Sequence, residues 1–239
     1  MPLLMIDLDN TLVDRDAAFR EAASVFLGEN ALPGDDLAWL MSVDASGYTP
    51  REDVARAMAE RYGGAVSGAT VRDFLDRGAA DRVVLAAATR DALGAAVGAG
   101  CTCVIVTNGR VVQQEAKIRG TGLDGIVHGW VISEAVGCKK PAPEIFRAAA
   151  ASVGASLRGA WVIGDSAHAD IGGARGLDGV RSVWVSGGRP WTDGTFRPTH
   201  ITDDAASALA HVGAHVGEQL GEHVGGARDD VAPDAPGPT

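Results

Sequence analysis

The stretch that decides the fold lies at residues 3–12 and reads LLMIDLDNTL. Its first four residues form a short, uninterrupted apolar run, which is typical of a strand buried on both faces of a parallel sheet. Asp7 and Asp9 follow directly, and because positions two apart in an extended segment face the same side, their carboxylates converge. Close carboxylates repel each other unless a cation or proton lies between them, so a hard cation with oxygen ligands fits. An acidic turn at a strand end is the alternative interpretation of this motif alone.

Similar apolar runs recur later in the chain. They occupy residues 103–106, 161–163 and 183–185, with residues 126–132 as a weaker candidate. Helical patterns separate them, for example the one opened by Pro143. Strands that alternate with helices predict an α/β fold with a Rossmann-like, doubly wound parallel sheet. Such sheets bind ligands beyond the carboxyl ends of their strands, so the residues that follow each run are the candidates for function.

The residues directly after the strand at 103–106 offer hydrogen-bond donors. They are Thr107, Asn108 and Gly109. A hydroxyl followed by an Asn-Gly turn into a helix suits an anion, because backbone amides at a helix N-terminus point at such a ligand. A plain turn with a helix cap is the alternative.

Two further motifs carry charge. Lys139 and Lys140 precede Pro141, and a lysine in the extended conformation that a following proline favours could reach an anion or a carboxylate. A solvated pair of lysines is the alternative. Asp165 follows the strand at 161–163, with Asp170 five residues later. An acid therefore stands where a parallel strand opens into the ligand crevice, although helix capping also explains it.

Residues 15–88 interrupt the alternation of strands and helices. They contain no convincing strand and several amphipathic helices, with apolar stripes such as Val54, Met58 and Tyr62. We therefore predict a helical cap at 15–88, inserted into a catalytic core made of residues 1–14 and 89–202. A C-terminal helix is expected at 203–216 and a disordered tail at 217–239, since that tail is rich in Gly, Pro, Ala and acid.

Composition excludes several classes of protein. The 239 residues are 46% hydrophobic and 22% charged, with a formal charge of -10, which indicates a folded globular chain and argues against a nucleic-acid partner. No apolar run is long enough for a membrane span. Three cysteines without a CxxC motif favour a reducing cytoplasm. We expect a monomer or homodimer that binds a small molecule.

The order strand-DxDxT, strand-TNG, KKP-helix, strand-GDxxxxD resembles the signature set of the haloacid dehalogenase superfamily. The joint occurrence of the four motifs makes the match specific, and it covers about residues 3 to 202. The helical insert between the first two motifs is similar to the α-helical cap of that superfamily's subfamily I, which is rich in phosphatases. The resemblance implies a Mg²⁺-dependent phosphatase that acts on a small phosphorylated metabolite through a phospho-aspartate.

The resemblance also implies roles for the motif residues. Asp7 would be the nucleophile and Asp9 the general acid and base. The implied catalytic set is Asp7, Asp9, Thr107 and Lys140. The implied phosphate-binding set is Asp7, Thr107, Asn108, Gly109 and Lys140. The implied Mg²⁺ ligands are Asp7, Asp9 through its backbone carbonyl, and Asp165, with Asp170 as a ligand or a partner of the lysine. Positive charge at this site is needed because an Asp nucleophile must approach a phosphate dianion.

Two other functions stay open on the sequence. A haloacid dehalogenase uses the first Asp but needs neither the second acid, Asp9, nor Mg²⁺. A phospho-accepting receiver domain shares an Asp, a Thr and a Lys on a doubly wound sheet, but it is about half as long and its acceptor follows an internal strand. In this superfamily the cap selects the leaving group. Tyr48 and Arg51 are the candidate substrate contacts, and Arg15 and Asp16 are the other charges near the cap's loops.

Overall fold

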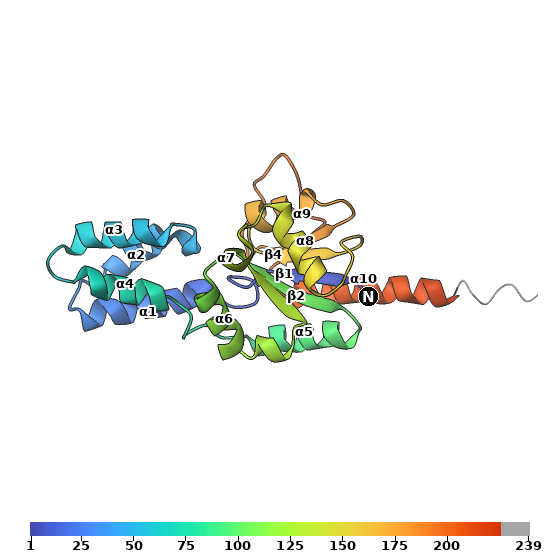
Figure 1. Cartoon of the computed structure of the whole chain (residues 1–239), viewed down its shortest axis with the longest axis horizontal. Helices are drawn as coiled ribbons and strands as arrows, with labels where there is room; N and C mark the ends of the chain where they lie inside the picture. Colours follow the sequence, from blue (N-terminus) through green and yellow to red (C-terminus); the bar gives the residue numbers. More distant parts are fainter. Residues whose placement is uncertain (226–239) are drawn as a thin grey trace, which may run out of the picture.

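A parallel sheet forms the centre of the larger part of the molecule (Figure 1). The computed structural model describes residues 1–225, with side chains as far as Val216. In spatial order the six strands are β3 (Gly129–Ile132), β2 (Thr102–Thr107), β1 (Leu3–Ile6), β4 (Trp161–Gly164), β5 (Arg181–Val185) and β6 (His200–Thr202). Every neighbouring pair is parallel. The predicted Rossmann-like α/β fold is therefore confirmed.

The edge strand β6 is absent from the prediction. It has three residues, and Ile201 at its centre is 43% exposed. Such a strand lacks the buried apolar run that reveals the central strands in a sequence, because an edge strand faces water along one side.

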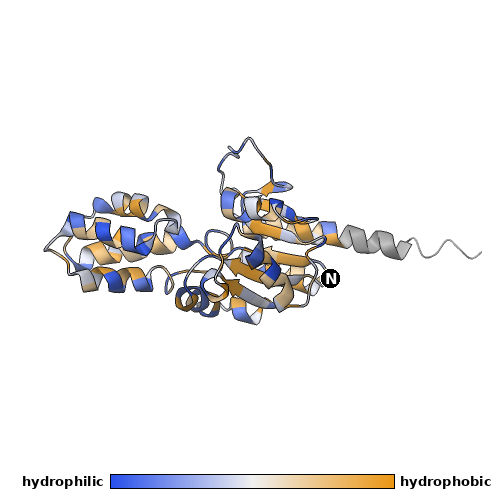
Figure 2. Ribbon diagram, turned by 45° about the horizontal axis from the view of Figure 1, so that its top comes forward, coloured by the Kyte–Doolittle hydropathy of each residue, from blue (hydrophilic) through white to orange (hydrophobic). Residues whose placement is uncertain are grey.

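Helices cover both faces of the sheet, whose strands appear in orange at the centre of Figure 2. Successive side chains of a strand alternate between faces, so Leu4 and Ile6 pack into one core while Leu3 and Met5 pack into another. The first core is completed by α5 (Ala87–Gly98), α6 (Val111–Gly120) and α10 (Ala205–Gly225). The second is completed by α8 (Pro143–Ser152) and α9 (Gly172–Arg175). Each fully buried Leu or Ile stabilises the fold by about 1.5–3 kcal/mol.

The register of the central strands decides where the site lies. Ile6 at the end of β1 is aligned with Ile105 of β2 and with Ile163 of β4. Because the strands are parallel, the loops that follow them leave from the same edge of the sheet. The residues after β1, β2 and β4 are thereby brought together.

Four helices between β1 and α5 form a smaller part on the left of Figure 1, which we call the cap. They are α1 (Arg15–Glu29), α2 (Asp36–Asp44), α3 (Arg51–Tyr62) and α4 (Gly68–Arg77). They share a hydrophobic core of their own, which includes Phe19, Met58 and Leu75. The expected stripe of Val54, Met58 and Tyr62 is buried in it. The expected boundary near residue 88 falls in the first turn of α5.

The C-terminal helix is longer than predicted. Instead of ending at residue 216 it runs through Gly225 as α10, so the expected tail at 217–239 begins with helix. Residues 217–225 contain good helix formers such as Gln219 and Leu220, and no proline lies between residue 217 and Pro233. The rest of the expected tail, 226–239, lies outside the described residues. Within the described residues, no helix combines the length and the apolar character needed to cross a membrane.

Candidate active site

The loop after β1 is tied to the loop after β4. The Asp7 amide donates to the Ile163 carbonyl at 2.9 Å, and the Asp165 amide donates to the Thr11 hydroxyl at 3.1 Å. Between them Asn10 adopts a φ of 58°, a left-handed conformation that Asn tolerates better than most residues. This turn reverses the chain after Asp9 and leads it into the cap.

Three carboxylates and one ammonium group meet at the sheet edge. Asp7, Asp165 and Asp170 each offer an oxygen, and these oxygens lie within 4.8 Å of one another. Lys140 Nζ donates to Asp7 Oδ1 at 2.6 Å and to Asp170 Oδ1 at 2.7 Å. The glycine that ends β4 is required here, because a Cβ at Gly164 would lie 2.2 Å from the Asp170 carboxylate. The structure therefore brings together residues from the first, third and fourth predicted motifs.

The pKa values of the two acids Asp7 and Asp165 are raised, because both are buried close to other carboxylates. Burial raises the pKa of Asp7 well above its ordinary value, and Asp170 and Asp165 add to the rise while Lys140 opposes it. Burial, followed by the charge of Asp170, raises the pKa of Asp165 to about 7. Burial disfavours the charged form of Lys140, but Asp170 and Asp7 outweigh it, so that its pKa is raised. One lysine thus fails to neutralise the three carboxylates.

The cluster fits a divalent cation of the Mg²⁺ type. Its donor set consists of carboxylate oxygens, which hard cations prefer, and a cation would remove the repulsion that raises the pKa values of Asp7 and Asp165. The side chain of Asp9 is outside this cluster and binds other partners. A ligand role for Asp9 therefore has to use its backbone carbonyl.

The second motif is held by side chains of neighbouring elements. Asn108 and Lys140 form a reciprocal pair, in which Asn108 Nδ2 donates to the Lys140 carbonyl at 3.0 Å and the Lys140 amide donates to Asn108 Oδ1 at 2.8 Å. The Gly109 amide donates to the Ser133 hydroxyl at 3.0 Å. Gly109 must lack a side chain, because a Cβ would lie 2.9 Å from Gln114. Its amide already has a partner, so its role in phosphate binding stays a prediction.

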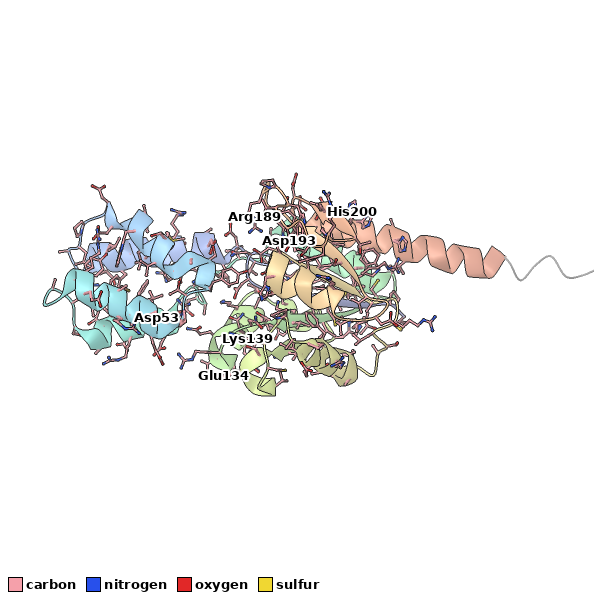
Figure 3. The ribbon with its side chains drawn as sticks, turned by 90° about the horizontal axis from the view of Figure 1, so that it is seen from above. Asp53, Glu134, Lys139, Arg189, Asp193 and His200 are labelled. Atoms are coloured by element: carbon pink, nitrogen blue, oxygen red, sulfur yellow. The ribbon has the colours of Figure 1, made fainter. Side chains whose placement is uncertain are left out.

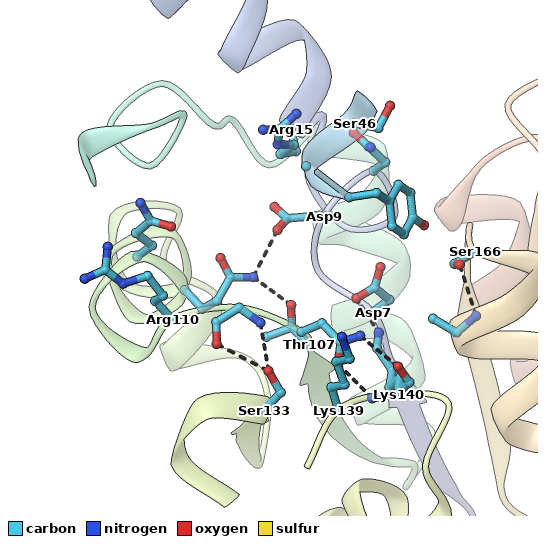
Figure 4. A pocket seen from close by; sticks show the side chains of 18 of the residues that line it. Asp7, Asp9, Arg15, Ser46, Thr107, Arg110, Ser133, Lys139, Lys140 and Ser166 are labelled. Atoms are coloured by element: carbon cyan, nitrogen blue, oxygen red, sulfur yellow. Dashed lines mark hydrogen bonds and ion pairs between the residues drawn. The ribbon is translucent and has the colours of Figure 1, made fainter. Parts of the chain in front are cut away.

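Asp9 is bound by two residues of α6 that the sequence did not reveal. Lys117 Nζ lies 2.7 and 2.8 Å from the two carboxylate oxygens of Asp9. Gln114 Nε2 donates to Asp9 Oδ2 at 3.0 Å and to Thr107 Oγ1 at 2.6 Å, and Figure 4 shows the Asp9 carboxylate turned away from Asp7. Burial opposes ionisation of Asp9, but the charge and hydrogen bonds of Lys117, helped by Gln114, hold its pKa below the ordinary value.

The same helix also contacts the cap. Gln113 Nε2 donates to the carbonyls of Leu75 and Asp76 at 3.1 and 2.6 Å, and Arg110 forms an ion pair with Asp76 at 2.6 Å. These bonds join the start of α6 to the C-terminal turn of α4. Cap and core are therefore connected at the site by side chains as well as by the two chain crossings.

A cavity of about 460 Å³ lies between cap and core. Its core side is lined by every catalytic, phosphate-binding and metal-binding residue that was predicted, and Lys139 lies at the end of the core that faces the cap (Figure 3). Tyr48 and Arg51, the two predicted cap contacts, line the opposite wall. The pocket has room for a small phosphorylated molecule.

A third residue that the sequence did not reveal contacts Asp165. Arg189 Nη2 lies 3.2 Å from Asp165 Oδ2 and donates to the Asp165 carbonyl at 3.0 Å. The Trp184 indole donates to the same carbonyl at 2.8 Å. Arg189 comes from the segment after β5, where no motif marks it. The Arg189 side chain is 55% exposed, so the ion pair is screened by water and orients Asp165 more than it neutralises it.

Curated proteins of similar sequence are phosphatases. Phosphoserine phosphatase of Thermus thermophilus is 39% identical over 89 residues, which is 37% of this chain and 35% of that protein. Glyceraldehyde 3-phosphate phosphatase of Pyrococcus abyssi is 34% identical over 85 residues, which is 36% of this chain and 35% of that protein. The matches span about a third of the length of these relatives.

Solved structures share the whole architecture. The HAD-hydrolase YfnB of Bacillus subtilis, bound to magnesium, superposes with a TM-score of 0.70 at 25% identity, over 88% of this chain and 97% of that one. A 2-haloacid dehalogenase of Pseudomonas syringae superposes with a TM-score of 0.59 at 21% identity, over 92% and 99%. The fold alone therefore does not separate the two chemistries.

A family model decides the membership. The model described as haloacid dehalogenase-like hydrolase matches residues 1–178, about three quarters of the chain, and includes all four motifs that meet at the sheet edge. The chain therefore belongs to the haloacid dehalogenase-like hydrolases.

Proposed function

We propose that this protein is a Mg²⁺-dependent phosphatase that hydrolyses a small phosphomonoester through a phospho-aspartate intermediate. The observation that carries the proposal is the separation of two carboxylates on one loop. Asp7 lies in the cluster with Asp165, Asp170 and Lys140, while Asp9 is held apart by Lys117. A nucleophile and a separate acid-base group are what two-step phosphate transfer requires.

In the first step a carboxylate oxygen of Asp7 attacks phosphorus, and the bond between phosphorus and the leaving oxygen breaks. Asp9 donates a proton to that oxygen, so the product leaves as an alcohol. Lys140 neutralises charge beside Asp7, and Thr107 and Asn108 bind phosphoryl oxygens. Mg²⁺, when held by Asp7, Asp165 and the Asp9 carbonyl, supplies positive charge that lowers the repulsion between nucleophile and phosphate.

In the second step water attacks the phosphorus of the phospho-aspartate. Asp9, now ionised, accepts a proton from this water, the bond between phosphorus and the Asp7 oxygen breaks, and inorganic phosphate leaves. The ion pair with Lys117 favours the ionised form that this step needs. For the first step Asp9 has to be protonated, so its ion pair with Lys117 has to be lost before the substrate reacts.

Asp9 also distinguishes the proposal from a dehalogenase. Displacement of halide from carbon needs no acid to protonate the leaving group, whereas an alkoxide does. Buried residues of α6 fix the Asp9 carboxylate at the cavity, with Gln114 2% exposed and Lys117 6% exposed. Such a position supports an acid-base group in the reaction.

The test is hydrolysis of p-nitrophenyl phosphate with Mg²⁺ and with EDTA. Release of p-nitrophenol that requires the metal is the expected result. Metal-independent release of halide from a 2-haloacid would contradict the proposal in favour of a dehalogenase. Stable phosphorylation without turnover would contradict it in favour of a phospho-acceptor domain.

Phosphoserine and glyceraldehyde 3-phosphate, named by the relatives, are the first substrates to compare by kcat/KM. A wider panel of phosphometabolites should follow. We further propose a cytoplasmic location, which the free thiols of Cys101, Cys103 and Cys138 support.

A further inference from the structure

The cap wall of the cavity contains two arginines that share one carboxylate. Asp44, at the end of α2, is fully buried. Arg15 begins α1 and Arg51 begins α3, and both form ion pairs with Asp44. Both guanidinium groups line the cavity that also holds Asp7 and Asp9. In Figure 4 Arg15 lies on the cap side of Asp9.

The hydrogen-bonding capacity of Asp44 is used up. Its Oδ2 accepts from Arg15 Nη1 and from the Gly47 amide at 2.9 Å. Its Oδ1 accepts from Arg15 Nη2 at 2.7 Å and from Arg51 Nη1 at 3.0 Å. A carboxylate has about four lone-pair sites, so Asp44 has none left for the remaining donors of Arg51.

Arg51 keeps donors for a ligand. In the part of the chain with described side chains, no acceptor is hydrogen-bonded to its Nε or Nη2, and its side chain is 28% exposed. Of the other acids near Arg51, Asp16 pairs with Arg15 and Ser46, and Asp9 is bound by Lys117. Burial, with a further contribution from the charge of Arg15, lowers the pKa of Arg51 despite Asp44. Burial thus outweighs the carboxylate charges around Arg51, and an anionic ligand would favour its charged form.

We propose that Arg51, held in place by Asp44, binds a carboxylate on the leaving group, so that the substrate is the phosphate ester of a small hydroxy acid. This inference rests on the proposed function. A planar guanidinium suits a carboxylate, and in a cavity of about 460 Å³ the phosphate at Asp7 and the acid at Arg51 belong to one compact molecule. Esters of neutral polyols leave the Arg51 donors without a partner.

Binding of two non-hydrolysable phosphonates tests the inference apart from catalysis. The probes are 3-phosphonopropionate, which carries a carboxylate, and propylphosphonate, which carries a methyl group in its place. Isothermal titration calorimetry in Mg²⁺ compares them on the full chain. We expect 3-phosphonopropionate to bind roughly 10- to 100-fold more tightly, the usual effect of a hydrogen-bonded charge pair.

Two variants on α3 test whether the preference for 3-phosphonopropionate depends on Arg51. Arg51→Gln should remove most of the preference, and Asp44 stays paired with Arg15 in this variant. Arg51→Lys should keep part of it. The matched control is Arg56→Gln, also on α3, whose exposed partner Asp53 lies on the cap in Figure 3. This control should keep the whole preference.

The outcomes separate the two proposals. Equal binding of both phosphonates to the wild type overturns the inference, and so does a preference that survives in Arg51→Gln. A preference that depends on Arg51, together with no hydrolysis of any phosphate ester, leaves the anion site standing and overturns the proposed function. Failure of both phosphonates to bind in Mg²⁺ overturns both.

Discussion

Asp7 and Asp9 stand two residues apart on the same loop, yet their surroundings drive their charges in opposite directions. Burial raises the pKa of Asp7, and the nearby charges of Asp170 and Asp165 add to the rise against the opposing charge of Lys140. Around Asp9 the neighbours are Lys117 and Gln114, and its pKa is lowered. The backbone brings both carboxylates to the cavity, but the elements packed against each one decide its chemistry. The loop after β4 prepares Asp7 for a cation, and α6 prepares Asp9 for proton transfer.

Removal of the nucleophile should have the largest effect. Asp7→Asn should lower kcat with p-nitrophenyl phosphate by about 10⁴-fold or more, because no covalent intermediate can form. The fold should remain, since the change removes a carboxylate whose charge is disfavoured by burial, and Lys140 keeps Asp170 as a partner. Thermal unfolding in EDTA checks this and should give a Tm at or above that of the wild type. Phospho-labelling that persists at another residue would rule out Asp7.

Removing the acid-base group should cost less. Asp9→Asn should lower kcat by roughly 10²- to 10⁴-fold, the usual contribution of a positioned proton donor. The loss should be smaller with p-nitrophenyl phosphate than with an alkyl phosphate, because nitrophenolate leaves without a proton. Equal losses with both substrates would contradict proton donation to the leaving group as the limiting role of Asp9, since the second step is common to both substrates.

The ion pair on α6 can be broken without touching either carboxylate. Lys117→Met should lower kcat by about 10- to 100-fold, because Asp9 loses the cation that fixes it, and should cost roughly 1–3 kcal/mol of unfolding free energy, because the partly exposed Asp9 loses its main partner. Arg119→Met is the control, since Arg119 lies on the same helix in an exposed pair with Glu115. That variant should change stability by less than about 0.5 kcal/mol and leave kcat unchanged. Equal behaviour of the two variants would mean that the Asp9 pair has no special role.

The smallest expected effect is a pH dependence of stability in EDTA. Asp165 has a pKa of about 7 in the folded chain against an ordinary value of 3.8, so the folded state binds the proton more tightly. The free energy of unfolding should therefore fall as the pH rises from about 4 to about 7, by an amount that lowers Tm by on the order of 10 °C. Mg²⁺ should restore Tm at pH 7, and Asp165→Asn should flatten the slope. Asp9 acts in the opposite sense: because its folded pKa is lowered, its contribution to stability is lost only as the pH falls below the ordinary aspartate pKa of 3.8.

The sequence predicts the sheet and the surroundings of Asp7 well. The central strands appear as buried apolar runs, and Asp7, Thr107, Lys140 and Asp165 follow strands or open a helix at positions that parallel topology brings to one edge. Gln114 and Lys117 are different, because two polar residues three apart on a helix normally face water. Only the packing of α6 against the loop after β1 shows that they face inward.

The buried charges of the cap are hidden in the sequence for a similar reason. Asp44 ends a helix that has no clear apolar stripe, and a single acid at a helix end usually lies in solvent. Its burial depends on Arg15 and Arg51, which come from two other helices. No local pattern in the sequence joins these three residues.

Helix α6 has a consequence beyond catalysis. Within ten residues it bonds to the last turn of α4 through Arg110 and Gln113, and to Asp9 through Gln114 and Lys117. A helix of this length behaves as a rigid rod, so its two sets of bonds keep a fixed geometry relative to each other. Separation of the cap from the core has to break the bonds of Arg110 and Gln113, while Ile118 keeps the same helix packed in the core beside Asp9. One helix thus sets both the position of the closed cap and the position of the proton donor.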